Sequence, residues 1–209
     1  MKKHALALLL ALALALTGCI TTGTGRTGGT GGGSSLLSPA ILHKQETFVF
    51  NTLPRNADEL KAMPEAALTT PFMTAALTVA ALCAYSENPS AGIAMLNVLR
   101  GPQPLSNREI QFLRDRFAGN KAYKSFSYFE GAMPQNNYTP NTPYRVTVSE
   151  QAYSYPEPEY AKLFLQSGGA DSPRGITMRL KPSTGQWFVI EYSSLLLDIR
   201  APASQNPWR

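Results

Sequence analysis

Cysteine and histidine are scarce in this sequence, which has two of each among 209 residues. His4 and Cys19 belong to the first nineteen residues, so His43 and Cys83 alone remain for the rest of the chain. One of each cannot supply a His/Cys zinc site, and Cys83 has no partner for an internal disulfide. We therefore predict no metal and no cofactor. Any serine–histidine or cysteine–histidine catalysis would have to use His43, and we assign no catalytic residue.

Charge is also sparse, with 14 acidic and 19 basic residues and a formal net charge of +5. Lys2 and Lys3 precede an unbroken Ala/Leu run, residues 5–16, which is typical of a secretory signal and too short to span a bilayer. Loss of both lysines with this segment lowers the net charge to +3. Nucleic-acid-binding domains are far more basic, so we expect no nucleic-acid partner.

The signal ends in Leu16-Thr17-Gly18-Cys19, which resembles the lipobox of bacterial lipoproteins. The resemblance implies cleavage between Gly18 and Cys19 and a diacylglycerol thioether on Cys19. Two acyl chains anchor firmly because each buried methylene contributes about 0.8 kcal/mol. We expect a signal peptide over residues 1–18 and a protein anchored in the bilayer on the extracytoplasmic face of the cell membrane. The alternative is an ordinary signal peptide with a chance cysteine.

Beyond the cleavage site the composition changes twice. Residues 19–35 are mostly Gly, Thr and Ser and carry too little apolar surface to fold. They predict a tether that holds the next segment roughly 20–25 Å from the lipid. Residues 36–209 have the length and apolar content of a single domain.

A nearly uninterrupted apolar segment, residues 71–86, organises this domain. Thr70 can cap a helix there, and Pro71 suits its first turn. A membrane span needs about 20 apolar residues, and this segment is shorter and contains hydroxyls. It therefore predicts a central helix buried within the domain.

The rest of the domain reads as shorter helices followed by strands. Helices are predicted at 57–63, from Pro89 to Gly101 and from Ser106 to Gly119, and strands at 47–50, 144–149, 161–166, 175–181 and 186–192, with a strand or short helix at 195–199. Residues 126–143 predict an ordered, irregular connection. This order indicates an α+β fold in which a helical part around the buried helix packs on a C-terminal antiparallel sheet.

From about residue 72 to residue 208 the chain resembles an uncharacterised family of exported and lipid-anchored bacterial proteins, a domain of unknown function. The resemblance rests on ALCAY, LRGPQPLS with FLRDRF, SYFEGAMPQNNYTP, YAKLF with SGGADSPR, and QWF with DIRAP and PW. It implies a single domain in the cell envelope. The family carries no established activity, so no catalytic role is implied.

Two loops supply most of the candidate binding residues. In residues 126–143, Tyr128, Asn137 and Tyr138 place rings beside amides, a combination that suits sugar or peptide recognition. The alternative is a loop held by buried aromatics.

In residues 167–174, Gly168 and Gly169 can adopt positive φ and present amides to an anion, with Asp171 and Arg174 selecting a polar ligand. The alternative is a hairpin loop that satisfies its own backbone.

Arg114 is a further candidate, because with Arg116 it could bind a carboxylate or phosphate; the alternative is that both offset the helix dipole.

These observations favour a membrane-anchored, non-enzymatic binding module whose partner is an envelope protein or a glycan. One alternative is an envelope hydrolase that uses paired carboxylates. Another is a purely structural lipoprotein. The carboxylates considered are Glu130, Glu150, Glu157, Glu159 and Glu191.

Overall fold

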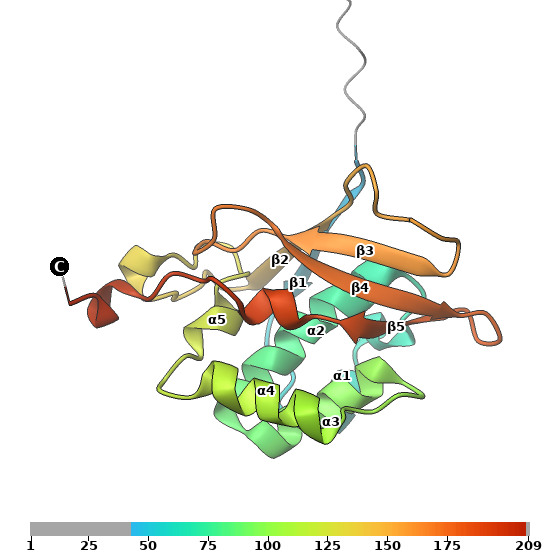
Figure 1. Ribbon diagram of the computed structural model, residues 1–209, viewed down its shortest axis with the longest axis horizontal. Helices are drawn as coiled ribbons and strands as arrows, with labels where there is room; N and C mark the ends of the chain where they lie inside the picture. The colour runs from blue at the N-terminus through green and yellow to red at the C-terminus, as the bar shows by residue number, and fades with distance from the viewer. Residues whose placement is uncertain (1–42, 208–209) are drawn as a thin grey trace, which may run out of the picture. The chain divides into compact units, whose positions relative to one another are not determined.

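The computed structural model describes residues 43–207. The predicted signal peptide, the cleavage site, Cys19, the tether and Trp208 lie outside the described residues. Within them the fold is α+β, as the sequence predicted: helices gather on one face of a five-stranded antiparallel sheet (Figure 1).

The sheet follows the order of the chain. Its strands are β1 (Gln45–Phe50), β2 (Tyr144–Ser149), β3 (Tyr160–Leu165), β4 (Arg174–Lys181) and β5 (Gln186–Glu191). β1 pairs with β2 over its full length, although all five α-helices lie between them in the chain.

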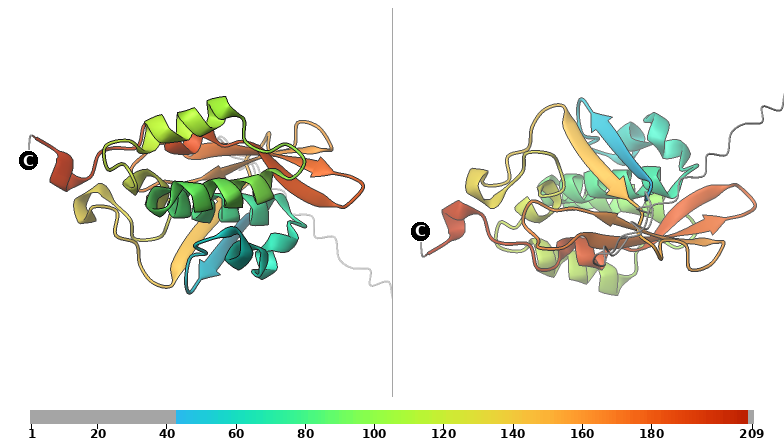
Figure 2. Two further views of the ribbon diagram at one scale, coloured as in Figure 1. Left: turned by 90° about the horizontal axis from the view of Figure 1, so that it is seen from below. Right: turned by 90° about the horizontal axis from the view of Figure 1, so that it is seen from above.

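The pairing of β2 with β3 is short, with two partner pairs, Val148↔Leu165 and Ser149↔Phe164. Beyond these pairs the two strands separate, so β1–β2 and β3–β5 form two diverging arms (Figure 2). This separation matters because the site described below lies where β2 and β3 part.

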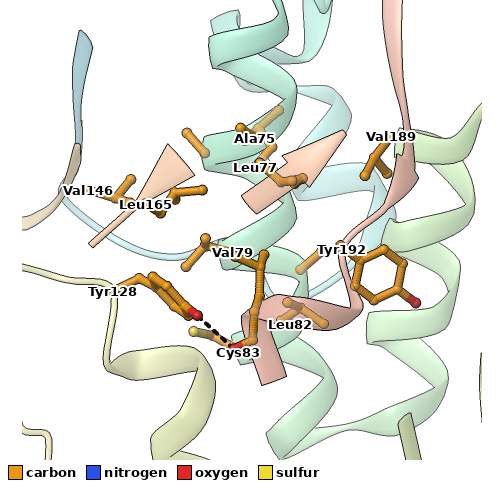
Figure 3. Close-up of a cluster of buried hydrophobic side chains, with 14 of the residues drawn as sticks. Ala75, Leu77, Val79, Leu82, Cys83, Tyr128, Val146, Leu165, Val189 and Tyr192 are labelled. Carbon is orange, nitrogen blue, oxygen red and sulfur yellow. Dashed lines mark hydrogen bonds between the residues drawn. The ribbon is translucent and has the colours of Figure 1, made fainter. Parts of the chain in front are cut away.

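Helix α2 (Pro71–Glu87) is the centre of the domain, and fourteen of its side chains are buried. The Thr70 hydroxyl accepts from the Met73 amide at its first turn, as the sequence predicted. The helix contacts all five strands, so nearly every one of its faces meets another element (Figure 3). This explains why its sequence is apolar all round.

The remaining helices are α1 (Ala57–Lys61), α3 (Pro89–Arg100), α4 (Asn107–Phe117) and α5 (Tyr123–Phe126). Side chains satisfy free amides at the first turns of α1, α3 and α4, but not at α5, which follows Ala122. Asn56 and Asn88 cap the first two, and Ser106 forms a capping box with Glu109. The predicted helix at 57–63 ends earlier, at Lys61, and the four-residue α5 was not predicted because one turn has no periodicity.

Four short 3₁₀ segments complete the chain: η1 (Pro64–Ala67), η2 (Pro134–Asn136), η3 (Ser193–Leu196) and η4 (Ala203–Gln205). The predicted strand or short helix at 195–199 is thus a 3₁₀ turn at 193–196.

One buried hydrogen bond and one glycine position the layers. The Thr74 hydroxyl donates to the Trp187 carbonyl at 2.7 Å, which joins α2 to β5. A Cβ added to Gly92 would lie 2.3 Å from the Tyr85 Cα, so this glycine lets α3 approach α2 closely. Cys83 lies in the helix that was predicted to be buried and is itself buried, and burial raises the pKa of its thiol to about 12. Among residues 43–207, none of the helices combines the length and the apolar character that a membrane span requires.

Candidate functional site

The two loops singled out in the sequence meet in the interior. The Ser167 hydroxyl donates to the Ser127 hydroxyl at 2.8 Å, and Ser127 donates in turn to the Lys124 carbonyl at 2.7 Å. The Gly169 amide donates to the Ser167 oxygen at 3.0 Å. This unbroken chain of hydrogen bonds fixes the loop after β3 against the segment that follows α5.

Two glycines allow this close approach. A Cβ on Gly168 would lie 2.0 Å from the Ala132 carbonyl oxygen, and one on Gly169 would lie 2.0 Å from the Tyr138 hydroxyl. Neither glycine has a positive φ. The Gly168 amide donates to the Ser127 carbonyl, and the Gly169 amide is already used. The expected anion nest, which needs positive φ and free amides, therefore does not form.

A groove with a volume of about 340 Å³ lies where the two loops adjoin β2. We call it the loop groove. It is lined by residues 127–133, by Arg145 and Thr147 of β2, and by Gln166 and Gly168. The separation of β2 from β3 opens it, and the Glu130 amide, which donates to the Arg145 carbonyl at 2.9 Å, continues the β2 ladder along one wall.

The chemistry of the loop groove is mixed. Arg145 and Glu130 face each other with Nε and Oε2 3.8 Å apart, and both side chains remain largely accessible. Met133 is 49% exposed and adds an apolar thioether. The Gln166 side-chain amide donates to the carbonyls of Ser167 and Ala170, so its N–H groups already have partners within the loop. Arg145, Glu130 and Met133 are therefore the side chains best placed to meet a ligand.

The predicted tyrosines serve the fold. Tyr128 and Tyr138 are both buried, and their hydroxyls donate at 2.7 Å to the carbonyls of Leu195 and Arg200. Figure 3 shows Tyr128 within the core beside Cys83. Burial raises the pKa of Tyr128, and burial together with the neighbouring Tyr123 raises the pKa of Tyr138 to about 12. Their rings position the loop and offer no open face to a ligand.

Three other predicted residues gather around residues 198–204. Asp171 forms an ion pair with Arg200, and the Arg200 amide donates to the Gly169 carbonyl at 3.0 Å. Arg174 donates to the Asp198 carbonyl, and the Asn137 side chain accepts from the Ser204 amide, both at 3.0 Å. The structure thus links these residues through the C-terminal segment, a connection that the sequence did not predict.

The other predicted residues lie apart from the loop groove. Arg114 is exposed on α4. Of the five carboxylates considered, Glu130 alone lines the groove. Glu159 Oε2 lies 3.8 Å from Arg179 Nη2, and the Glu150 carboxylate accepts a hydrogen bond from the Tyr155 hydroxyl. Among residues 43–207, no group of three or more His, Cys, Asp or Glu side chains is placed to hold a metal ion.

A family model for a domain of unknown function, DUF6935, matches residues 52–203, which is most of the chain. The chain belongs to the DUF6935 family. The match includes both loops, the loop groove and strands β2–β5 of this DUF6935 domain. No curated protein and no solved structure matches the chain.

The sequence did not point to the residues that join the two loops of this DUF6935 domain. Ser127 and Ser167 were not singled out, although a serine before a glycine pair is a common backbone-bonding position. Arg145 lies in the strand predicted at 144–149 and was not singled out as a candidate. Its place opposite Glu130 depends on how the loop folds back onto β2, which no local pattern encodes.

Proposed function

We propose that this DUF6935 protein is a lipid-anchored protein of the cell envelope, held through Cys19 on the extracytoplasmic face of the membrane. Its domain is a non-enzymatic binding module. The signal-like segment, the Leu16-Thr17-Gly18-Cys19 sequence and the Gly/Thr-rich residues after it support the anchor. The family match supports one domain beyond them.

The observation that carries the binding role is the convergence of two distant loops on the loop groove. Both are held by buried hydrogen bonds, so their surface is already organised before a ligand arrives. A preorganised surface loses less conformational entropy on binding. A volume of about 340 Å³ suits one sugar unit or a short peptide segment.

The side chains of the groove favour a polar ligand of little net charge. Arg145 and Glu130 supply one cation and one anion, and Met133 supplies apolar contact. We therefore propose a polar segment of an envelope protein or a glycan as the ligand class.

Capture from detergent-solubilised envelope extract tests the binding role. The bait is the chain from residue 20 onward, compared with Arg145→Ala/Met133→Ala and with the control Arg108→Ala, which changes α4. We expect partners that bind the wild type and the control to be lost from the groove variant. Identical partner profiles for all three baits would remove the loop groove from consideration.

Mass spectrometry of membrane fractions tests the anchor separately. We expect the first peptide of the mature chain to begin at Cys19 and to carry a diacylglycerol group, and Cys19→Ser to abolish both. An intact, unmodified residue 19 in the soluble fraction would refute the anchor and leave the groove experiment unaffected.

A further inference from the structure

The two edge strands of the sheet, β5 and β1, differ in whether their outward backbone groups have hydrogen-bond partners. At the β5 edge, the Trp187 amide donates to the Leu68 carbonyl at 2.9 Å and the Trp187 carbonyl accepts from Thr74. Farther along, the Ile190 carbonyl accepts from the Arg100 guanidinium at 3.3 Å. The chain therefore covers this edge with its own groups.

The β1 edge has no such cover within the described residues. The Glu150 amide donates to the Lys44 carbonyl, and the antiparallel register then directs every second residue of β1 toward β2. Gln45, Thr47 and Val49 point their N–H and C=O groups the other way. Across residues 43–207, no hydrogen bond uses these six backbone groups.

Edge strands of monomeric proteins are commonly protected by proline, charged side chains, a bulge or short length. β1 has six residues, QETFVF, with no proline and regular pairing to β2, and its one charged side chain, Glu46, is neutralised by an ion pair with Lys44 at 2.6 Å. Val49 is 44% exposed beside the open edge. This strand is suited to accept a partner strand.

We propose that β1 pairs with β1 of a second copy of this chain, in antiparallel orientation about a two-fold axis at Thr47. In this register Thr47 faces Thr47 of the second copy, and Gln45 faces Val49 of the second copy. All six free backbone groups of each copy then find partners, and the two sheets become one continuous sheet.

The side chains select this register over its neighbours. A shift toward the N-terminus would place Glu46 opposite Glu46 of the second copy, and like charges directly opposite each other are destabilising. A shift toward the C-terminus would pair Gln45 with Asn51, which lies outside the strand. The register centred on Thr47 opposes no like charges. The proposal rests neither on the lipid anchor nor on the loop groove.

Sedimentation equilibrium over a wide concentration range tests the pairing, using the chain from residue 20 onward, which keeps every described residue. We expect a reversible dimer. Thr47→Pro removes an N–H that points outward and leaves the β1–β2 ladder intact, so it should raise the dimer dissociation constant at least about tenfold. Thr47→Val, which keeps the backbone donor, should dimerise as the wild type does. If Thr47→Pro fails to fold, Val49→Lys makes the same test.

A cross-link reports the register. In this chain the remaining thiol is the buried Cys83. Thr47→Cys should give a disulfide-linked dimer on mild oxidation, and Lys162→Cys, on the exposed face of β3, should not. A monomer at all concentrations would overturn the proposal. So would a dimer whose dissociation constant is the same for the wild type, Thr47→Pro and Val49→Lys. Protection of the Thr47 and Val49 amides from hydrogen exchange in a monomer would overturn it too, since the chain's own N-terminal segment would then cover the edge.

Discussion

The hydroxyls of Ser127 and Ser167 lie 2.8 Å apart in the interior, and each residue is only 1% exposed. Neither hydroxyl has access to water, so each depends on the other and on the backbone groups at the two ends of the chain of bonds. The contact joins loops that are forty positions apart in the sequence. It is the physical basis for treating them as one site.

Ser127→Ala should destabilise the domain by about 1–3 kcal/mol, because the Ser167 hydroxyl would be left buried without its acceptor. The double variant Ser127→Ala/Ser167→Ala should cost less than the sum of the two single changes, since their shared bond is lost once. Urea unfolding of the four proteins measures this coupling. Additive costs would show that the two hydroxyls do not act as a unit.

Gly169→Ala should cost about 1–3 kcal/mol, because the new methyl group would lie 2.0 Å from the Tyr138 hydroxyl oxygen and force the two apart. Tyr138→Phe in the same chain should recover part of this loss by removing that oxygen. Thermal unfolding compares them, with Gly119→Ala as the control, because a Cβ there meets nothing within 4 Å, although its positive φ adds some strain. No rescue by Tyr138→Phe would contradict the proposed overlap.

Thr74→Val should destabilise the domain by about 1–3 kcal/mol, because the Trp187 carbonyl would lose the hydroxyl that binds it across the α2–β5 interface. Thr78→Val is the matched control. Thr78 is equally buried, but its hydroxyl donates to the Thr74 carbonyl within the same helix, so its loss should cost less than about 1 kcal/mol. Chemical denaturation distinguishes the two, and equal losses would contradict a special role for the Thr74 bond.

Acid should destabilise the domain partly through Glu109. Burial opposes its ionisation, but hydrogen bonds from the Ser106 hydroxyl and amide, together with Arg100, outweigh burial and lower the pKa of Glu109 below 4.5. The carboxylate therefore contributes stability above pH 4.5 that is lost as the pH falls through the lowered pKa.

Glu109→Gln should lower the free energy of unfolding at neutral pH and flatten its decline below pH 4.5. Denaturation curves recorded at successive pH values provide the measurement. Parallel curves for wild type and Glu109→Gln would show that Glu109 does not carry the linkage.

The elements that were predicted from the sequence are those with local causes. Thr70, Asn56, Asn88 and Ser106 cap helices through amides two or three residues away. Residues 144–149 alternate because one face of β2 packs on the core and the other does not. Such signals depend on a few neighbouring residues and can be read without knowing the fold.

The loops show where this reasoning ends. Gly168 and Gly169 suggested a backbone that needs positive φ. In the structure, glycine is required at both positions because Ala132 and Tyr138 leave no room for a Cβ atom. Tyr138 indicated an open aromatic surface, but its ring is buried and its hydroxyl binds the Arg200 carbonyl. In each case the deciding neighbour lies at least thirty positions away in the chain.

Composition and short-range periodicity were enough to predict the α+β class, the buried central helix, the starts of the capped helices and the alternating strands. Only the folded chain shows that two loops share a groove, that Arg145 faces Glu130, and that within residues 43–207 the β5 edge is covered while the β1 edge is not. Those relationships are contacts between distant segments, and their free energy depends on packing that exists only once the chain has folded.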